Sequence, residues 1–135
     1  MNTEEVAPSA REVLCVDFDS TLVEWGPLEG PFRFKPGAVD ALRAFRSLGY
    51  EIVILTSRAS QTWWYAHCRG TGEDPMAFGI RQHALVVAAM DSIGFTGVRV
   101  TAEKVPAFAY IDDRAVPFRD DWAEIVGMIP QAPMR

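Results

Sequence analysis

Residues 13–21, Val-Leu-Cys-Val-Asp-Phe-Asp-Ser-Thr, decide how the rest of the chain is interpreted. The run from Val13 to Val16 has no polar residue in it, which is typical of a strand buried on both faces of a parallel sheet. Asp17 and Asp19 follow at once, and residues two apart on an extended chain share a face. The stretch therefore predicts a central strand with paired carboxylates at its carboxyl end.

The remaining sequence alternates between strand patterns and helix patterns. Further strands are predicted at 51–56, 97–101 and 108–111. Helices are predicted from Pro36 to Gly49, from Ser60 to Gly70, over 80–93 with Leu85, Ala88, Ala89 and Ile93 facing inward, and around 118–126. Such alternation is typical of βαβ units with right-handed crossovers. We expect an α/β fold, a Rossmann-like three-layer α/β/α sandwich with a mainly parallel sheet.

Length and composition indicate one globular domain. The chain has 135 residues, of which 49% are hydrophobic and 23% are charged. That balance is ordinary for a folded protein and too apolar for a disordered one. We expect one domain over residues 11–128, with flexible tails at 1–10 and 129–135.

Charge and patterning exclude several classes of protein. The net charge of −5 disfavours a general nucleic-acid binder, which would carry a basic stripe. The longest apolar run, 84–90, is too short to span a bilayer, and residues 1–11 lack the apolar core of a signal peptide. Cys15 and Cys68 are too few for a disulfide scaffold. We therefore expect a cytoplasmic protein with no membrane partner.

Polar residues gather where the predicted strands end. They are Asp17 and Asp19 after the first strand, Thr56, Ser57 and Arg58 after the second, and Asp112 and Asp113 after the last. Ligands of open parallel sheets bind beyond the carboxyl ends of the strands. Carboxylate oxygens are ligands that Mg²⁺ prefers, and a cation relieves the repulsion between neighbouring acids. The sequence predicts a Mg²⁺ site at this edge.

The same edge offers donors for an anionic substrate. They are Thr56, Ser57, Arg58, Lys104 and the backbone N–H groups of Ser20 and Thr21. Phosphoryl transfer needs such groups to neutralise the phosphoryl oxygens while nucleophile and leaving group lie in line. An aspartate can serve as the nucleophile because it is ionised at neutral pH.

These residues carry a family resemblance. The segment 17–22, Asp-Phe-Asp-Ser-Thr-Leu, resembles the first motif of the haloacid dehalogenase superfamily of phosphohydrolases. The segment 52–58 resembles the second motif, Lys104 the third-motif lysine, and the segment 110–113 the fourth motif. The motifs occur in family order and reach from residue 13 to residue 113. The loops at 23–35 and 59–101 are too short for a cap domain, so the resemblance is to the small capless members.

The resemblance implies a role for each motif residue. Asp17 would be the nucleophile and Asp19 the general acid and base, with a proton on Asp19 favoured by the charge of Asp17. Thr56 and Lys104 would bind the phosphoryl group. The implied metal ligands are Asp17, Asp19 through its backbone carbonyl, Asp112 and, in support, Asp113. Because dehalogenases of the family usually lack the second aspartate, phosphate chemistry is favoured.

The predicted function is Mg²⁺-dependent hydrolysis of a small phosphate monoester, such as a nucleotide or a sugar phosphate. A polynucleotide end phosphatase is an alternative, since capless sites are open, but the acidic balance disfavours it. Open sites are also closed by a neighbouring subunit in some relatives, so a homo-oligomer is possible. Two non-enzymatic alternatives are disfavoured. In a phosphoacceptor signalling domain the acid pair comes early and the lysine last, whereas here the Asp-Asp pair follows the lysine. An inactive scaffold would not need Asp17 and Asp19 intact.

Several residues have a plainer interpretation as well. Asp112 and Asp113 could simply begin the last helix, where carboxylates suit the dipole. Lys104 could be a surface lysine. The aromatic residues at 63–65 suit either a pocket rim, a subunit contact or partial burial. The loop around Trp25 could stack on a leaving group such as a nucleotide, or pack against itself.

Overall fold

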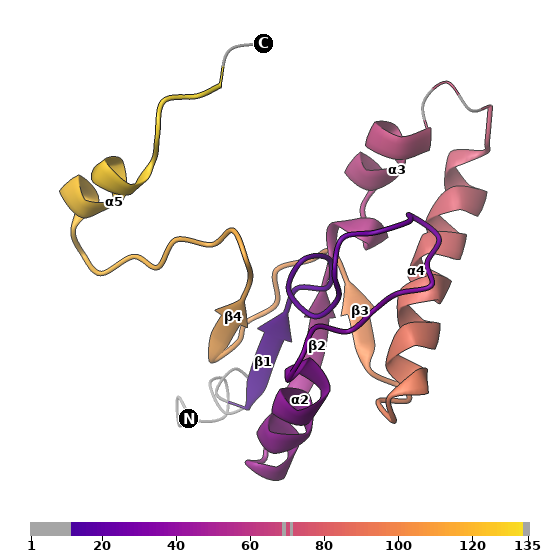
Figure 1. Ribbon diagram of the computed structural model, residues 1–135, viewed down its shortest axis with the longest axis horizontal. Helices are drawn as coiled ribbons and strands as arrows, with labels where there is room; N and C mark the ends of the chain where they lie inside the picture. The colour runs from indigo at the N-terminus through magenta and orange to yellow at the C-terminus, as the bar shows by residue number, and fades with distance from the viewer. Residues whose placement is uncertain (1–11, 69, 71, 134–135) are drawn as a thin grey trace, which may run out of the picture.

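Residues 12–68, 70 and 72–133 are described by the computed structural model (Figure 1). The expected tail at 1–10 and the last two residues of the expected tail at 129–135 lie outside the described residues. The elements in chain order are β1 (Val13–Val16), α2 (Ala38–Ser47), β2 (Glu51–Leu55), the 3₁₀ helix η2 (Ser57–Ala59), α3 (Gln61–Cys68), α4 (Pro75–Ser92), β3 (Arg99–Thr101), β4 (Ala109–Ile111) and α5 (Trp122–Met128).

The four strands form one parallel sheet in the order β3-β2-β1-β4. All four residues of β1 are buried at its centre, as the uninterrupted apolar run predicted. Val16, the last residue of β1, is in register with Ile54 of β2 and Ile111 of β4. The residues that follow these strands therefore emerge at the same edge. The predicted α/β class with a parallel sheet is confirmed.

Alternate residues of the strands face opposite sides of the sheet. Leu14, Val16, Ile52 and Ile54 point into the main core, where α2 contributes Leu42 and α4 contributes Val86 and Met90. On the other side, Val13, Cys15 and Val53 pack against Leu55, Val105 and Ala107. The burial of Cys15 agrees with a small apolar role for it.

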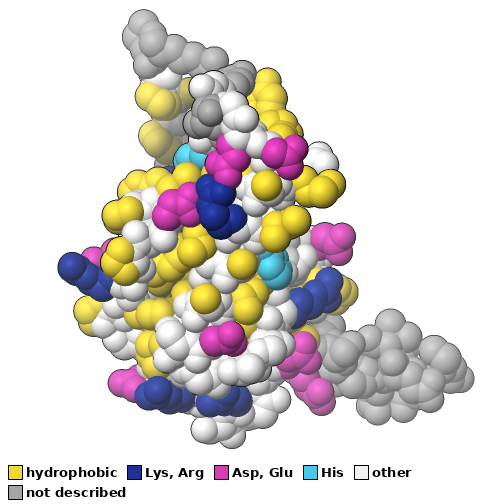
Figure 2. Space-filling model, turned by 90° about the vertical axis from the view of Figure 1, so that its right-hand side faces the viewer, with side chains coloured by type: hydrophobic (Ala, Val, Ile, Leu, Met, Phe, Trp, Pro, Cys, Tyr) yellow, Lys and Arg dark blue, Asp and Glu magenta, His cyan; other side chains and the backbone are white. Residues whose placement is uncertain are grey.

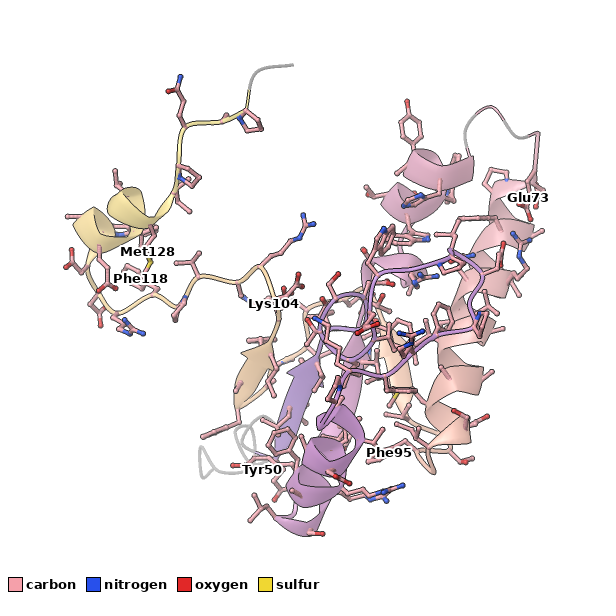
Figure 3. The ribbon with its side chains drawn as sticks, in the orientation of Figure 1. Tyr50, Glu73, Phe95, Lys104, Phe118 and Met128 are labelled. Atoms are coloured by element: carbon pink, nitrogen blue, oxygen red, sulfur yellow. The ribbon has the colours of Figure 1, made fainter. Side chains whose placement is uncertain are left out.

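Helix α5 lies apart from the sheet (Figure 1). Its Trp122 is 70% exposed, and Phe118 and Met128 lie beside it, away from the strands (Figure 3). The predicted last helix therefore forms without covering the second face of the sheet. That face is covered, within the described chain, by the segment that includes Val105 and Ala107. The three-layer α/β/α arrangement, with helices on both faces of the sheet, stays a prediction.

Helix α4 begins earlier than the sequence predicted. It starts at Pro75 instead of residue 80, and the Asp74 carboxylate caps it by accepting the N–H of Ala77 at 2.9 Å. Proline suits the first position of a helix because its missing N–H would have no partner there. The expected inward face was right only in part: Ala89 and Ile93 pack against the core and Ala88 is exposed, whereas the fully buried residues of α4 are Phe78, Gln82, Val86 and Met90.

The loop after β1 folds back on itself. Glu24 N–H donates to Arg33 O at 2.9 Å, and Lys35 N–H donates to Leu22 O at 2.8 Å. The ring of Phe32 meets the buried ring of Phe18 edge to face, with centroids 5.1 Å apart. These contacts anchor both arms of the loop, and its tip lies against η2 and α4, where Leu28 O accepts a hydrogen bond from Arg58 and Glu29 pairs with Arg81.

The side of the molecule that carries α4 is mixed in character. Acidic, basic and hydrophobic side chains are interspersed there, with no continuous basic surface in view (Figure 2). None of the helices in the described ranges is long and apolar enough to cross a membrane.

Candidate metal and phosphate site

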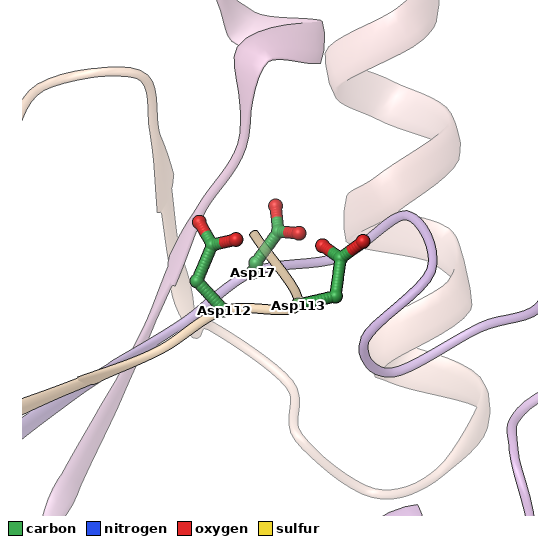
Figure 4. Close-up of side chains that lie close together, drawn as sticks. All are labelled: Asp17, Asp112 and Asp113. Carbon is green, nitrogen blue, oxygen red and sulfur yellow. The ribbon is translucent and has the colours of Figure 1, made fainter. Parts of the chain in front are cut away.

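Three carboxylates meet at the edge where β1 and β4 end. Oxygen atoms of Asp17, Asp112 and Asp113 all lie within 4.8 Å of one another (Figure 4). The pairing of the strands brings them together, because the N–H of Asp17 donates to Ile111 O at 2.9 Å. The Asp112 carboxylate is oriented by the N–H of Arg114 at 2.8 Å. Residues far apart in the chain thus form one acidic cluster.

The hydroxyl group of Thr21 joins two members of the cluster. Its Oγ1 lies 3.1 Å from Asp17 Oδ2 and 3.2 Å from Asp113 Oδ1, and it accepts the Asp113 N–H at 3.0 Å. One hydroxyl hydrogen serves one carboxylate at a time. The sequence places Thr21 in the first motif and predicts a backbone N–H at the site, but the role of the Thr21 side chain was missed. Its place four residues after Asp17, on the turn that closes β1, was the available signal.

The environment of Asp17 disfavours its charge. Burial and then the charge of Asp112 raise the pKa of Asp17 to about 7, and its hydrogen bond with Asp113 acts in the same direction. Hydrogen bonds from Thr21 and from the backbone of Phe18 oppose the rise. Burial works against ionisation of Asp113 as well, but hydrogen bonds with Asp17 and Thr21 hold the pKa of Asp113 below its usual range. A divalent cation would offset this repulsion, and the all-oxygen donor set fits a hard cation such as Mg²⁺.

The carboxylate of Asp19 points to a different partner. Its oxygens accept N–H bonds from Arg58 Nε at 2.7 Å and Arg58 Nη2 at 2.8 Å. The sequence argument expected the charge of Asp17 to keep a proton on Asp19. The structure instead gives Asp19 a cationic partner, and it is Asp17 whose pKa rises. The Asp19 carboxylate also lies outside the acidic cluster, so only its backbone carbonyl remains as the implied metal ligand.

Arg58 does not contact the cleft, which corrects its predicted role as a phosphate donor. Its side chain is 1% exposed, and Nη1 donates to Leu28 O at 2.8 Å and to Gln82 Oε1 at 2.6 Å. Thr56 follows β2 in an extended conformation and caps the start of η2, which turns Arg58 inward. The guanidinium is therefore engaged by the protein and positions Asp19.

The backbone N–H groups of Ser20 and Thr21 are also engaged. Ser20 N–H donates to Val23 O at 2.8 Å, and Thr21 N–H donates to Phe18 O at 3.3 Å. They therefore do not donate hydrogen bonds to a phosphate group, although the sequence predicted that they would. Ser20 has a φ of 65°, and its carbonyl accepts a hydrogen bond from the Lys35 ammonium. Its side-chain hydroxyl remains available at the cleft.

A cleft of about 1490 Å³ brings the remaining predicted residues together. Those that line it are Asp17, Asp19, Ser20, Thr56, Ser57, Lys104, Asp112 and Asp113. Lys104 lies at this end of the sheet, with its ammonium 5.0 Å from the ring centre of Tyr110 (Figure 3). Tyr110 is held in turn by its hydroxyl, which donates to Val105 O at 2.6 Å. Acidic side chains and side chains that can donate hydrogen bonds thus line one cleft.

Comparison of the chain with protein-family models, with curated proteins and with solved structures finds no match. The likeness to haloacid dehalogenase phosphohydrolases therefore depends on the four short motifs. What the site can do must be argued from its own geometry.

Proposed function

We propose that this protein is a Mg²⁺-dependent phosphatase that hydrolyses a phosphate monoester through a phosphorylated Asp17. The observation that carries the proposal is the meeting of Asp17, Asp112 and Asp113 within 4.8 Å at the edge of the sheet. Three carboxylates so close are costly unless a cation joins them. Side chains that can donate hydrogen bonds to a phosphate group line the same cleft. The cation and these side chains would therefore bind the same anionic substrate.

The residues that would hold Mg²⁺ are Asp17, Asp112 and Asp113, with the Asp19 carbonyl as a further oxygen. When bound, the ion would neutralise the carboxylates and the phosphoryl oxygens, so that one anion can approach another. Thr21 would keep Asp17 and Asp113 oriented through its hydroxyl. Ser20, Thr56, Ser57 and Lys104 are the proposed contacts of the phosphoryl oxygens.

In the first step the Asp17 carboxylate attacks phosphorus, and the bond from phosphorus to the ester oxygen breaks. Asp19 rests as a carboxylate paired with Arg58, so it takes the proton of the monoanionic ester when the substrate binds and gives that proton to the departing oxygen. In the second step that carboxylate takes a proton from water as the water oxygen attacks the phosphoryl group on Asp17. Inorganic phosphate leaves with that proton, and both side chains return to their carboxylate forms.

Arg58 has a positioning role in this scheme. Its two hydrogen bonds hold the Asp19 carboxyl in one orientation, at the cleft but outside the acidic cluster. The buried guanidinium of Arg58 stabilises the carboxylate that forms when Asp19 gives up its proton. The separation of the two aspartates suits their different tasks, because one must attack and the other must exchange protons.

Release of phosphate from a generic aryl phosphate tests the proposal. We expect hydrolysis by the wild-type chain with Mg²⁺, loss of hydrolysis after chelation, and loss in Asp17→Asn. Asp40→Asn is a matched control, because Asp40 is an exposed aspartate on α2, away from the cleft. Hydrolysis that survives chelation, or full turnover in Asp17→Asn, would contradict the proposal.

A further inference from the structure

An aromatic wall stands beside the acidic cluster. We use this name for Trp25, from the loop after β1, together with Trp63 and His67, which lie one turn apart on α3. Ring centroids are 6.2 Å apart for Trp25 and Trp63 and 4.3 Å apart for Trp63 and His67. Trp25 and Trp63 line the same cleft as Asp17 and Asp19. None of the proposed chemical steps uses these rings.

The inner part of the wall is fixed to the catalytic machinery. Trp63 Nε1 donates to Gln82 Oε1 at 3.2 Å, and Gln82 is fully buried. The Arg58 guanidinium lies 4.8 Å from the ring centre of Trp63. The same Arg58 holds the Asp19 carboxylate. The buried guanidinium of Arg58 therefore sets the position of the aromatic wall relative to the Asp19 carboxylate.

The outer part of the wall is open. Trp25 is 57% exposed, although its loop is anchored on both arms. Its ring meets Trp63 at 78°, an edge-to-face contact that leaves ring surface uncovered. A large apolar ring held in water at the mouth of a cleft costs free energy unless a ligand covers it. A flat aromatic group stacked on the indole would remove that cost.

Polar groups accompany the rings. The polar residues Ser60 and Thr62 line the cleft next to Trp63. The Ser60 hydroxyl is engaged within the chain, because it donates to Ser57 O at 2.6 Å and accepts the Trp63 N–H at 3.3 Å, which keeps the start of α3 close to Ser57. A nucleobase has donors and acceptors along its edge, whereas a phenyl or alkyl leaving group has none in its ring. The rings together with Thr62 at the cleft fit a base better than a plain aryl group.

We propose that the leaving group of the substrate is a nucleoside, whose base stacks on Trp25 while its phosphate reaches the acidic cluster. This deepens the proposed function and rests on it. A single nucleotide fits better than a polynucleotide, because the wall offers surface for one base and the net charge of −5 disfavours an extended phosphate backbone.

The test compares a nucleoside 5′-monophosphate with glycerol 2-phosphate as substrates of wild type, Trp25→Leu and Trp122→Leu. Stacking of one base on an aromatic ring contributes enough to binding that Trp25→Leu should raise KM for the nucleotide about tenfold. KM for glycerol 2-phosphate should not change. Trp122→Leu removes an exposed tryptophan outside the cleft lining and should change neither value.

Binding of the nucleotide to the Asp17→Asn protein, measured by tryptophan fluorescence, separates this inference from the proposed function. Weaker binding after an added Trp25→Leu substitution supports the aromatic wall even if no ester is hydrolysed. Hydrolysis of both substrates with no effect of Trp25→Leu overturns the inference and leaves the phosphatase standing. An equal effect on both substrates, or a lower KM for phosphotyrosine or a phosphorylated oligonucleotide than for the nucleotide, also overturns it.

Discussion

Asp19 and Arg58, 39 positions apart in the chain, form a two-bond ion pair with N–O distances of 2.7 and 2.8 Å. The pair links the turn that follows β1 to the turn that follows β2. Arg58 is almost fully buried, whereas the Asp19 side chain keeps 16% exposure toward the cleft. The pair therefore combines a buried anchor with a carboxylate that substrate can reach.

Asp19→Asn is expected to lower stability as well as turnover. Asparagine leaves the buried guanidinium of Arg58 without a counter-charge, and removing one partner of such a pair costs about 3–5 kcal/mol. The remaining exposure of Asp19 favours the lower end, about 3 kcal/mol. Urea unfolding measures the change, with Asp40→Asn as the control. An unfolding free energy equal to that of wild type would show that the ion pair contributes nothing.

Arg58→Lys is expected to reduce kcat with little change in KM. Lysine keeps the positive charge but cannot make the paired bonds of a guanidinium, so the Asp19 carboxyl loses its fixed orientation. Misplacement of a reacting group by about 1 Å costs about 100-fold in rate. Steady-state kinetics on an aryl phosphate measures both constants, and the exposed Arg43→Lys is the matched control. A rise in KM at constant kcat would instead assign Arg58 to substrate binding.

Protons and Mg²⁺ should compete at Asp17. Its pKa of about 7 in the metal-free protein lies above its unfolded value, so the folded state binds that proton more tightly. The contribution of Asp17 to stability is therefore lost as pH rises from about 4 through 7. Mg²⁺ should raise the melting temperature more at pH 8 than at pH 5, and Asp17→Asn should abolish this difference. An equal effect of Mg²⁺ at both pH values would contradict a cation on Asp17.

Thr21→Val is expected to weaken Mg²⁺ binding. Valine matches threonine in shape but leaves the Asp113 N–H and both carboxylates without the hydroxyl they share. Loss of a group that orients metal ligands typically costs 10–100-fold in affinity, and about tenfold is expected here. Titration calorimetry with Mg²⁺ measures the change, and Thr21→Ser should restore most of it. Equal affinities for the valine and serine variants would remove the hydroxyl from the site.

Local pattern was enough to predict the edge of the sheet where the site lies. The apolar run before Asp17 and the one before Asp112 predicted strands, and parallel strands in register place the following acids together. The ion pair of Asp19 could not be predicted in this way. It depends on the turn at Thr56 and on Gln82 of α4, which lie on different elements.

Two further differences between prediction and structure concern the start of α4 and the packing of α5. The start of α4 was missed because Pro75 and Gly79 are typical of loops, whereas Asp74 supplies a cap that makes proline favourable. The amphipathic pattern near Trp122 predicted a helix, and α5 forms there. Periodicity indicates which side of a helix is apolar but carries no information on which surface that side will cover.

Acid-quenched mass spectrometry tests most directly whether Asp17 attacks phosphorus with the help of a cation. After mixing with an aryl phosphate and Mg²⁺, the tryptic peptide 12–33 should carry a phosphoryl group on Asp17. Chelation, or Asp17→Asn, should abolish that modification and the release of phosphate together. Phosphate release with no phosphoryl group on this peptide, or undiminished release without a divalent cation, would contradict the account.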